Sequence, residues 1–236
     1  MTSKFKALGL ALIAVLAISA AIAQASQAAA HFGAEGEKYA TAVTGKQIEG
    51  TITGEKLTAH QFTTSAGTVK CTTATFAGSL TKKGKELTLA PTYSGCTLAG
   101  LGATVNMNTC DYLFTAEETV SPGLTDAITV NLHVICPTGK VIEVKSTVNS
   151  CVVTISGAAV ANAAGAKNQN LVGITAENTT TATPFIDVDA TIDVTGIHYT
   201  TNGKCLNDGG VPQTKADGKY EGAATIDSPD RGVTVT

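Results

Sequence analysis

The sequence predicts an all-β fold, a mostly antiparallel two-layer sandwich or two small β lobes, closed by disulfides. Threonine makes up roughly one residue in six, glycine is abundant at 24 residues, and valine and isoleucine recur at alternate positions. Threonine, valine and isoleucine favour strands, whereas glycine favours turns. Many short strands separated by regular turns are typical of a sandwich or a barrel.

The clearest strand is expected over residues 185–200. Its apolar side chains recur at every second position, and the positions between them are aspartate or threonine. One face should therefore pack in the core, and the other should meet solvent. The same alternation predicts further strands at 47–53, 69–81, 86–93, 103–114, 127–135, 141–148, 152–156, 171–177 and 220–227.

These strands fall into two β-sheet regions, residues 31–156 and 171–236. The connection between them, residues 157–170, is rich in alanine and asparagine, contains internal glycines and lacks an apolar stripe. We interpret it as a linker rather than a helix. Two lobes and one sandwich with a long crossover both fit this division, and a single domain is the preferred interpretation.

Residues 1–30 are typical of a secretory signal peptide. The first segment is basic, and the run from 7 to 23 is apolar and uncharged. That run is shorter than the roughly 20 residues that a membrane-spanning helix needs. Ala-x-Ala triplets end at Ala23, Ala25 and Ala30. We therefore expect cleavage within 23–30 and a secreted or surface-held mature protein.

Six cysteines follow this leader, and an even number in an oxidising compartment favours three disulfides. Cys71 and Cys96 lie at equal distances in sequence from the expected turn at 82–85. Such residues face each other in an antiparallel hairpin, with Cα atoms about 4.5 to 5.5 Å apart, which suits a disulfide. The disulfide residues are Cys71, Cys96, Cys110, Cys136, Cys151 and Cys205.

The same reasoning predicts the other two pairs. Cys110 and Cys136 lie at equal distances in sequence from Gly123, in the expected turn at 121–123. A further turn directly after Cys136 directs the next strand away from it, so Cys151 is too far along that strand to be its partner. By elimination, Cys151 pairs with Cys205.

Four features together resemble exported threonine-rich β proteins of unknown function from high-GC Gram-positive bacteria. They are the leader, Cys71 before Phe76-Ala-Gly78, the segment Tyr93-Ser-Gly-Cys96 and the segment Tyr220-Glu-Gly222. The resemblance covers most of the mature chain. Because that group has no assigned activity, the resemblance implies no catalytic residue.

No catalytic residue is expected. Nucleophilic hydrolysis needs an activated hydroxyl or thiol beside a histidine base and an acidic residue. The sequence has no Gly-x-Ser-x-Gly turn. His31 is expected at the mature N-terminus, and His60, His133 and His198 lie in strand patterns or beside an aromatic residue. We interpret these three as structural or surface histidines.

No metal or cofactor site is expected either. His133 and Cys136 are three residues apart, but no second pair at zinc-like spacing exists, and a disulfide would consume Cys136. Asp187, Asp189 and Asp193 share one strand face without forming an EF-hand loop. A solvated strand face is the preferred interpretation of these carboxylates.

Composition argues against two further ligand classes. The net charge of −3 implies no basic surface for nucleic acid. Sugar-binding faces commonly present stacked aromatic rings, and tryptophan is absent here. The tyrosines within the predicted sheets are Tyr93, Tyr112, Tyr199 and Tyr220.

We therefore predict an exported, non-enzymatic β module with a binding or structural role at the cell surface or outside the cell. Its partner is an unknown surface or extracellular molecule, with no nucleic acid and, after signal cleavage, no membrane. The alternatives are a secreted hydrolase whose site assembles only in the fold, and a carrier of a small ligand in an apolar cavity.

Non-reducing peptide mapping tests the predicted pairing. Three cross-linked peptides are expected, joining Cys71 to Cys96, Cys110 to Cys136, and Cys151 to Cys205. A peptide joining Cys96 to Cys110, or free thiols at Cys71 and Cys96, would contradict the hairpin reasoning.

Overall fold

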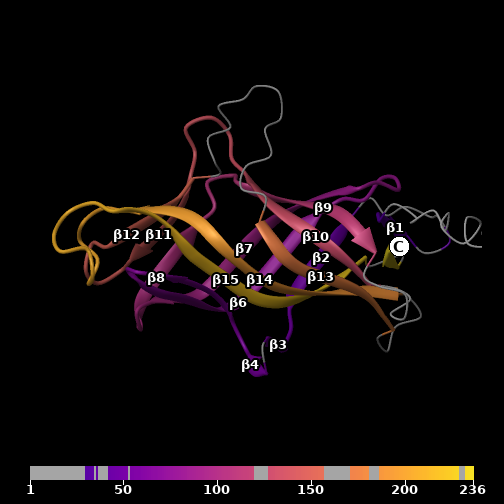
Figure 1. The fold of residues 1–236 in the computed structure, drawn as a ribbon, viewed down its shortest axis with the longest axis horizontal. Coiled ribbons are helices and arrows are strands. Elements are labelled where there is room, and N and C mark those ends of the chain that lie inside the picture. Colours follow the sequence, from indigo (N-terminus) through magenta and orange to yellow (C-terminus); the bar gives the residue numbers. More distant parts are fainter. Residues whose placement is uncertain are drawn as a thin grey trace, which may run out of the picture.

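The computed structural model describes residues 30–34, 36, 42–52, 54–119, 127–156, 171–180, 186–228 and 232–236. Its regular elements are β-strands joined by turns (Figure 1). The leader through residue 29, the turn at 121–123 and the connection at 157–170 lie outside the described residues. The strands are β1 (Phe32–Ala34), β2 (Val43–Gln47), β3 (Gly50–Ile52), β4 (Glu55–Leu57), β5 (His60–Thr64), β6 (Gly67–Gly78), β7 (Glu86–Leu98), β8 (Leu101–Asn106), β9 (Asp111–Thr119), β10 (Ala127–Ile135), β11 (Ile142–Ser146), β12 (Val152–Ile155), β13 (Leu171–Thr180), β14 (Ile186–Thr201), β15 (Thr214–Asp227) and β16 (Val233–Val235).

Most of these strands form one antiparallel sheet that closes on itself. The long strands β6, β7, β14 and β15 run through the whole sheet. At one end, β9, β10, β13 and β2 complete a ring with them. At the other end, β8, β11, β12 and β5 complete a second ring with the same four. We call the first the terminal end and the second the loop end (Figure 1).

The predicted all-β, mostly antiparallel class is confirmed, whereas the expected two-layer sandwich is replaced by this ring-like sheet. The reason lies in strand length. A strand such as β14, which spans 186–201, pairs with β13 near its start and with β12 near its end. The three strands that the second predicted region contributes to this sheet, β13 to β15, are adjacent in it and pair at both sides with strands of the first region, as in the β10–β13 and β15–β2 pairs.

Three disulfides link strands and loops of the sheet, and all three have the predicted partners. Cys71 lies directly opposite Cys96 in the β6–β7 ladder, with Cα atoms 4.0 Å apart. Cys110–Cys136 continues the register of β9 and β10. Cys151–Cys205 joins the start of β12 to the loop after β14 and closes the longest segment of the three.

A bulge at a glycine in β14 makes the inward and outward pattern of its side chains differ from the predicted alternation. Val188, Ile192 and Val194 are buried, as the alternation predicts, although Asp187 on the opposite face is buried too. After Gly196, whose φ is +81°, the phase changes and Ile197 turns inward. An extra residue in one strand has this effect. The bulge keeps apolar side chains inside the ring along both halves of β14.

A small second sheet occupies the terminal end. Strand β1 pairs with β16, and the side chain of Asn178 on β13 both donates to and accepts from the backbone of Val235. Phe32, Val233 and Val235 are almost fully buried in the core of the ring. The two ends of the described chain therefore meet and close this opening of the sheet (Figure 1).

Two glycines with positive φ provide a matched test of this backbone. A Cβ at Gly173 would lie 2.0 Å from the Asp193 carbonyl oxygen, whereas one at Gly196 would meet nothing within 4 Å. Gly196→Ala should cost about 1 kcal/mol, from strain alone. Gly173→Ala should cost about 3 kcal/mol or more, because β13 must also move away from β14. Urea denaturation measures both, and equal losses would contradict this close approach.

Candidate functional site

The three candidate histidines lie on three different strands in different environments. His60 on β5 is buried inside the ring, His133 on β10 is buried, and His198 on β14 is exposed. The hydrogen-bond partners of His60 are the Tyr220 hydroxyl and the Ala223 carbonyl oxygen. Neither is a carboxylate, so His60 lacks the acidic residue that would orient a catalytic base.

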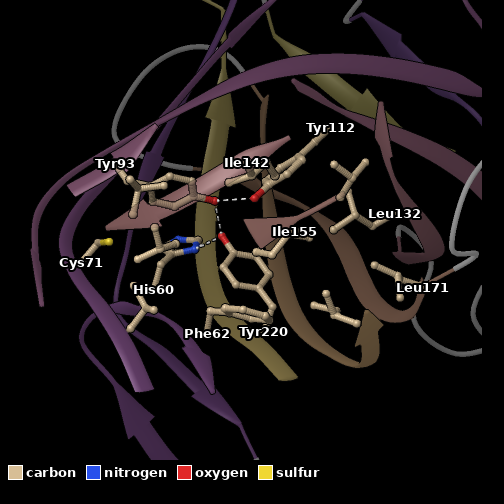
Figure 2. Close-up of a pocket in the computed structure, with 15 residues that line it drawn as sticks. His60, Phe62, Cys71, Tyr93, Tyr112, Leu132, Ile142, Ile155, Leu171 and Tyr220 are labelled. Carbon is tan, nitrogen blue, oxygen red and sulfur yellow. Dashed lines mark hydrogen bonds between the residues drawn. The ribbon is translucent and has the colours of Figure 1, made fainter. Parts of the chain in front are cut away.

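His60 instead ends a chain of three tyrosines (Figure 2). Its Nδ1 lies 2.6 Å from the hydroxyl of Tyr220, which lies 2.7 Å from that of Tyr93. The Tyr93 hydroxyl lies 3.0 Å from that of Tyr112. These side chains come from β5, β15, β7 and β9, which meet only because the sheet closes into a ring.

The positions of the hydrogens in this chain follow from its ends. A carbonyl oxygen only accepts, so the 3.1 Å contact with Ala223 places a hydrogen on Nε2 of His60. In the neutral imidazole, Nδ1 is then an acceptor, and Tyr220 must donate to it. Because Tyr220 has used its hydrogen, Tyr93 donates to Tyr220, and Tyr112 donates to Tyr93. Every hydrogen of the chain has an acceptor.

Burial keeps the whole chain neutral. Desolvation lowers the pKa of His60 from 6.5 to about 4, against a smaller opposing effect of the hydrogen bond to Ala223. Desolvation also raises the pKa of Tyr112 to about 12 and raises the pKa values of Tyr93 and Tyr220 well above their usual range. The chain therefore carries no charge at neutral pH.

The chain borders an internal cavity of about 60 Å³, whose remaining wall is apolar. Gly222 makes room for the imidazole beside it, since a Cβ there would lie 2.3 Å from Nδ1 of His60. A second cavity of about 30 Å³ lies nearer the terminal end and is lined by side chains such as Phe76 and Val130. Sites for small organic ligands commonly measure about 300 Å³ or more. Both cavities are far smaller.

The carboxylates considered for calcium have other partners. Asp189 accepts a hydrogen bond from Thr225, and Asp193 pairs with Lys219 at 3.1 Å. Cys136, considered for zinc with His133, is bound in a disulfide. Among the residues that the structure describes, no group of three or more histidine, cysteine or carboxylate side chains could hold a metal ion.

The loop end presents a different kind of candidate site. Within the described part of the chain, four large apolar side chains are more than half exposed, and Val148, Leu206 and Val211 are three of them. Val148 lies in the β11–β12 turn, and the other two lie in the loop between β14 and β15. The fourth, Val172, lies on β13.

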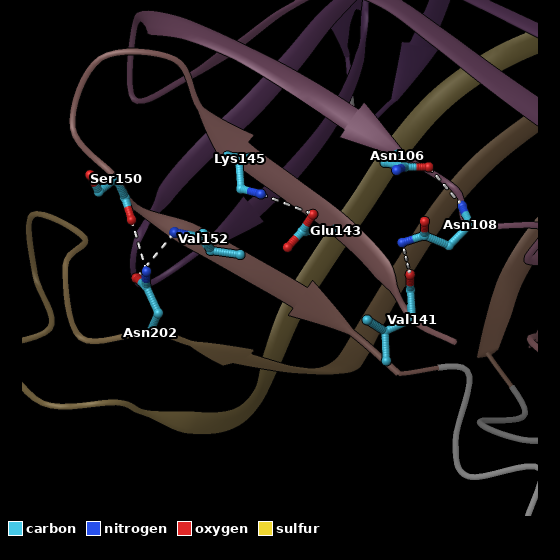
Figure 3. A network of polar contacts seen from close by, with 8 residues as sticks. All are labelled: Asn106, Asn108, Val141, Glu143, Lys145, Ser150, Val152 and Asn202. Carbon is cyan, nitrogen blue, oxygen red and sulfur yellow. Dashed lines mark hydrogen bonds and ion pairs between the residues drawn. The ribbon is translucent and has the colours of Figure 1, made fainter. Parts of the chain in front are cut away.

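Covalent and polar contacts hold these two loops together, and Figure 3 shows the polar contacts of Asn202. The Cys151–Cys205 disulfide joins them. The Asn202 side chain donates to the Ser150 carbonyl oxygen at 2.8 Å and accepts from the Val152 amide at 3.1 Å. The β14–β15 loop also reaches the β5–β6 turn, where Asn207 donates to the Ser65 carbonyl oxygen. The exposed apolar side chains therefore stand on a fixed frame.

Sequence reasoning did not predict that the residues of either site come together. It placed the tyrosines in the predicted sheets but expected no strand over β5, which carries His60. Alternation along one strand also does not show which strands face each other across a closed ring. The loop-end site could have been found from the predicted Cys151–Cys205 pair, which joins the segments that carry Val148 and Leu206.

Comparison with known proteins shows no matching family model, no matching curated protein and no matching solved structure. No helix in the described ranges has the length and apolar character needed to span a membrane. The assignment of function therefore depends on the geometry of this chain alone.

The buried histidine predicts an acid-dependent loss of stability. The unfolded chain binds a proton on His60 near pH 6.5, whereas the folded chain does so only near pH 4. Stability should therefore fall as the pH drops from 6.5 towards 4, with His60 contributing about 3 kcal/mol of that loss. His60→Gln should reduce the loss by about that amount, as measured by urea denaturation across this range. Identical slopes for His60→Gln and the parent protein would contradict the assignment.

Proposed function

We propose that this chain is an exported, non-enzymatic β module that binds a partner through its loop end. The observation that carries the proposal is the exposure of Val148, Leu206 and Val211, at 68%, 69% and 56%, on two loops that the Cys151–Cys205 disulfide joins. Exposed apolar side chains that adjoin one another mark interaction surfaces. Loops held by a rigid scaffold are also where binding residues concentrate.

The disulfides support the extracellular part of this proposal. Disulfides persist in oxidising environments and are rare in the cytosol. All six cysteines are paired, and each half-cystine is almost fully buried. The predicted leader agrees with the same location.

The two alternatives find less support in the described geometry. A carrier needs room for its ligand, and the larger interior cavity holds about 60 Å³. A hydrolase needs a base with an acidic partner, and His60 contacts a tyrosine and a carbonyl oxygen instead. A binding surface on the loops requires neither a cavity nor a charged interior.

A pair of matched variants tests the loop end. Leu206→Asp and Val172→Asp make the same kind of change at two exposed positions, one on the loop end and one on β13. Both should leave thermal unfolding nearly unchanged, because exposed side chains add little to stability. Binding of the labelled mature protein to the surface of the producing cells should weaken about tenfold or more in Leu206→Asp, as for a residue at the centre of an interface.

Specific results would overturn each part of this proposal. Equal binding by the parent protein and Leu206→Asp would overturn the loop-end assignment, as would an equal loss in Val172→Asp. Turnover of an ester, glycoside or peptide substrate by the parent protein would overturn the non-enzymatic assignment.

A further inference from the structure

We propose that His60, Tyr220, Tyr93 and Tyr112 form a proton-gated water site, in which one proton added to His60 reverses their hydrogen-bond chain and draws a water molecule into the adjoining cavity. This goes beyond the binding role of the loop end and does not depend on it. The ligand class is a small hydrogen-bond acceptor, and water is the acceptor that solvent supplies.

A count of hydrogens leads to this site. In the neutral chain, the three hydroxyls and Nε2–H supply four hydrogens for four contacts, and the last contact is with Ala223. No polar atom of this chain is left without a partner, so the neutral cavity has no need of water. A wall that is otherwise apolar favours a dry cavity in this state.

Protonation upsets this balance by one hydrogen. The proton comes from solvent and adds to Nδ1, the atom that accepts from Tyr220 in the neutral form. Five hydrogens must then share the same four contacts. When Nδ1 donates to Tyr220, the other bonds can be kept only if Tyr220 donates to Tyr93 and Tyr93 donates to Tyr112. The surplus hydrogen is then on Tyr112.

The cavity provides the place for an acceptor. Tyr112 lines it together with the other members of the chain. A water molecule needs roughly 10 to 15 Å³ by this measure, and about 60 Å³ is present. Water that accepts from Tyr112 would remove the cost of a buried donor without a partner, which is considerable in an apolar interior. The protonated imidazole and the filled cavity therefore stabilise each other.

No other charged group intrudes on this exchange in the described structure. Strand β5 packs against β6 and β15, and the imidazole of His60 also lies near the Tyr93 ring of β7. The titratable side chains that face His60 from these strands are tyrosines. Lys70 on β6 is exposed. Lys219 and Glu221 on β15 flank the inward-facing Tyr220, so they point outward, and they pair with each other.

Two identical substitutions on β10 separate the proposed site from the rest of the core. Val134 lines the cavity and lies directly opposite Tyr112, whereas Val130 lines the second, smaller cavity. Val134→Ile should fill space that the water needs, and Val130→Ile is the matched control. The readout is the NMR titration midpoint of the His60 Cε1–H, together with water-to-protein NOEs at the Tyr112 ring above and below that midpoint.

The proposal predicts different titration midpoints for the two variants. The midpoint should fall by about half a pH unit or more in Val134→Ile, since the surplus hydrogen loses its acceptor, and should stay at the parent value in Val130→Ile. Water NOEs at Tyr112 should appear only on the acid side. If the fold is lost before His60 titrates, Val134→Ile should lose more stability on acidification than Val130→Ile. Equal behaviour of the variants, or water NOEs of equal strength at neutral pH, would overturn the proposal.

Discussion

Closure of the sheet is the constraint on which the rest of this structure depends. An open sheet exposes unpaired backbone groups at its edges, and closure removes them. Here the ring closes twice, because the four long strands pair with one set of shorter strands at the terminal end and with another set at the loop end. This change of partners along a strand requires strands that bend, and bulges at positions such as Gly173 and Gly196 allow them to do so. The three disulfides then join residues that the closed ladders already bring together.

Closure also explains why a polar chain can lie in an apolar interior. Tyr93, Tyr112 and Tyr220 come from three different strands and share hydrogen bonds only because the ring brings their hydroxyls to one place. A buried hydroxyl without a partner costs free energy, whereas a fully connected network is tolerated and favours one arrangement over others. The chain therefore links the interior packing to the register of the strands around it. The exposed loops are free of this constraint, and the binding surface that we propose lies on them.

The sequence predicts the strands and their pairing in hairpins better than it predicts their assembly. Strand β10 occurs over 127–135 as expected, because its apolar residues recur at every second position from Ile128 to Val134. The expected strand at 103–114 is two strands instead, since residues 107–110 form a turn closed by the Cys110 amide and the Met107 carbonyl oxygen. Strands β1 and β16 were missed, because segments of three residues carry too little alternation to be recognised. The candidate sites depend on contacts between distant strands, which no local pattern contains.

The closing pairs of the sheet offer the most direct test of this account. If the sheet is a ring, backbone NOEs must connect β6 to β7 near Thr75 and Thr92, and also connect β12 to β14 near Val153 and Thr201. Both sets should be present in one folded protein, with slow amide exchange along both ladders. A sandwich that is open along either seam would lack one of the two sets and would exchange its amides rapidly there, and this result would contradict the account.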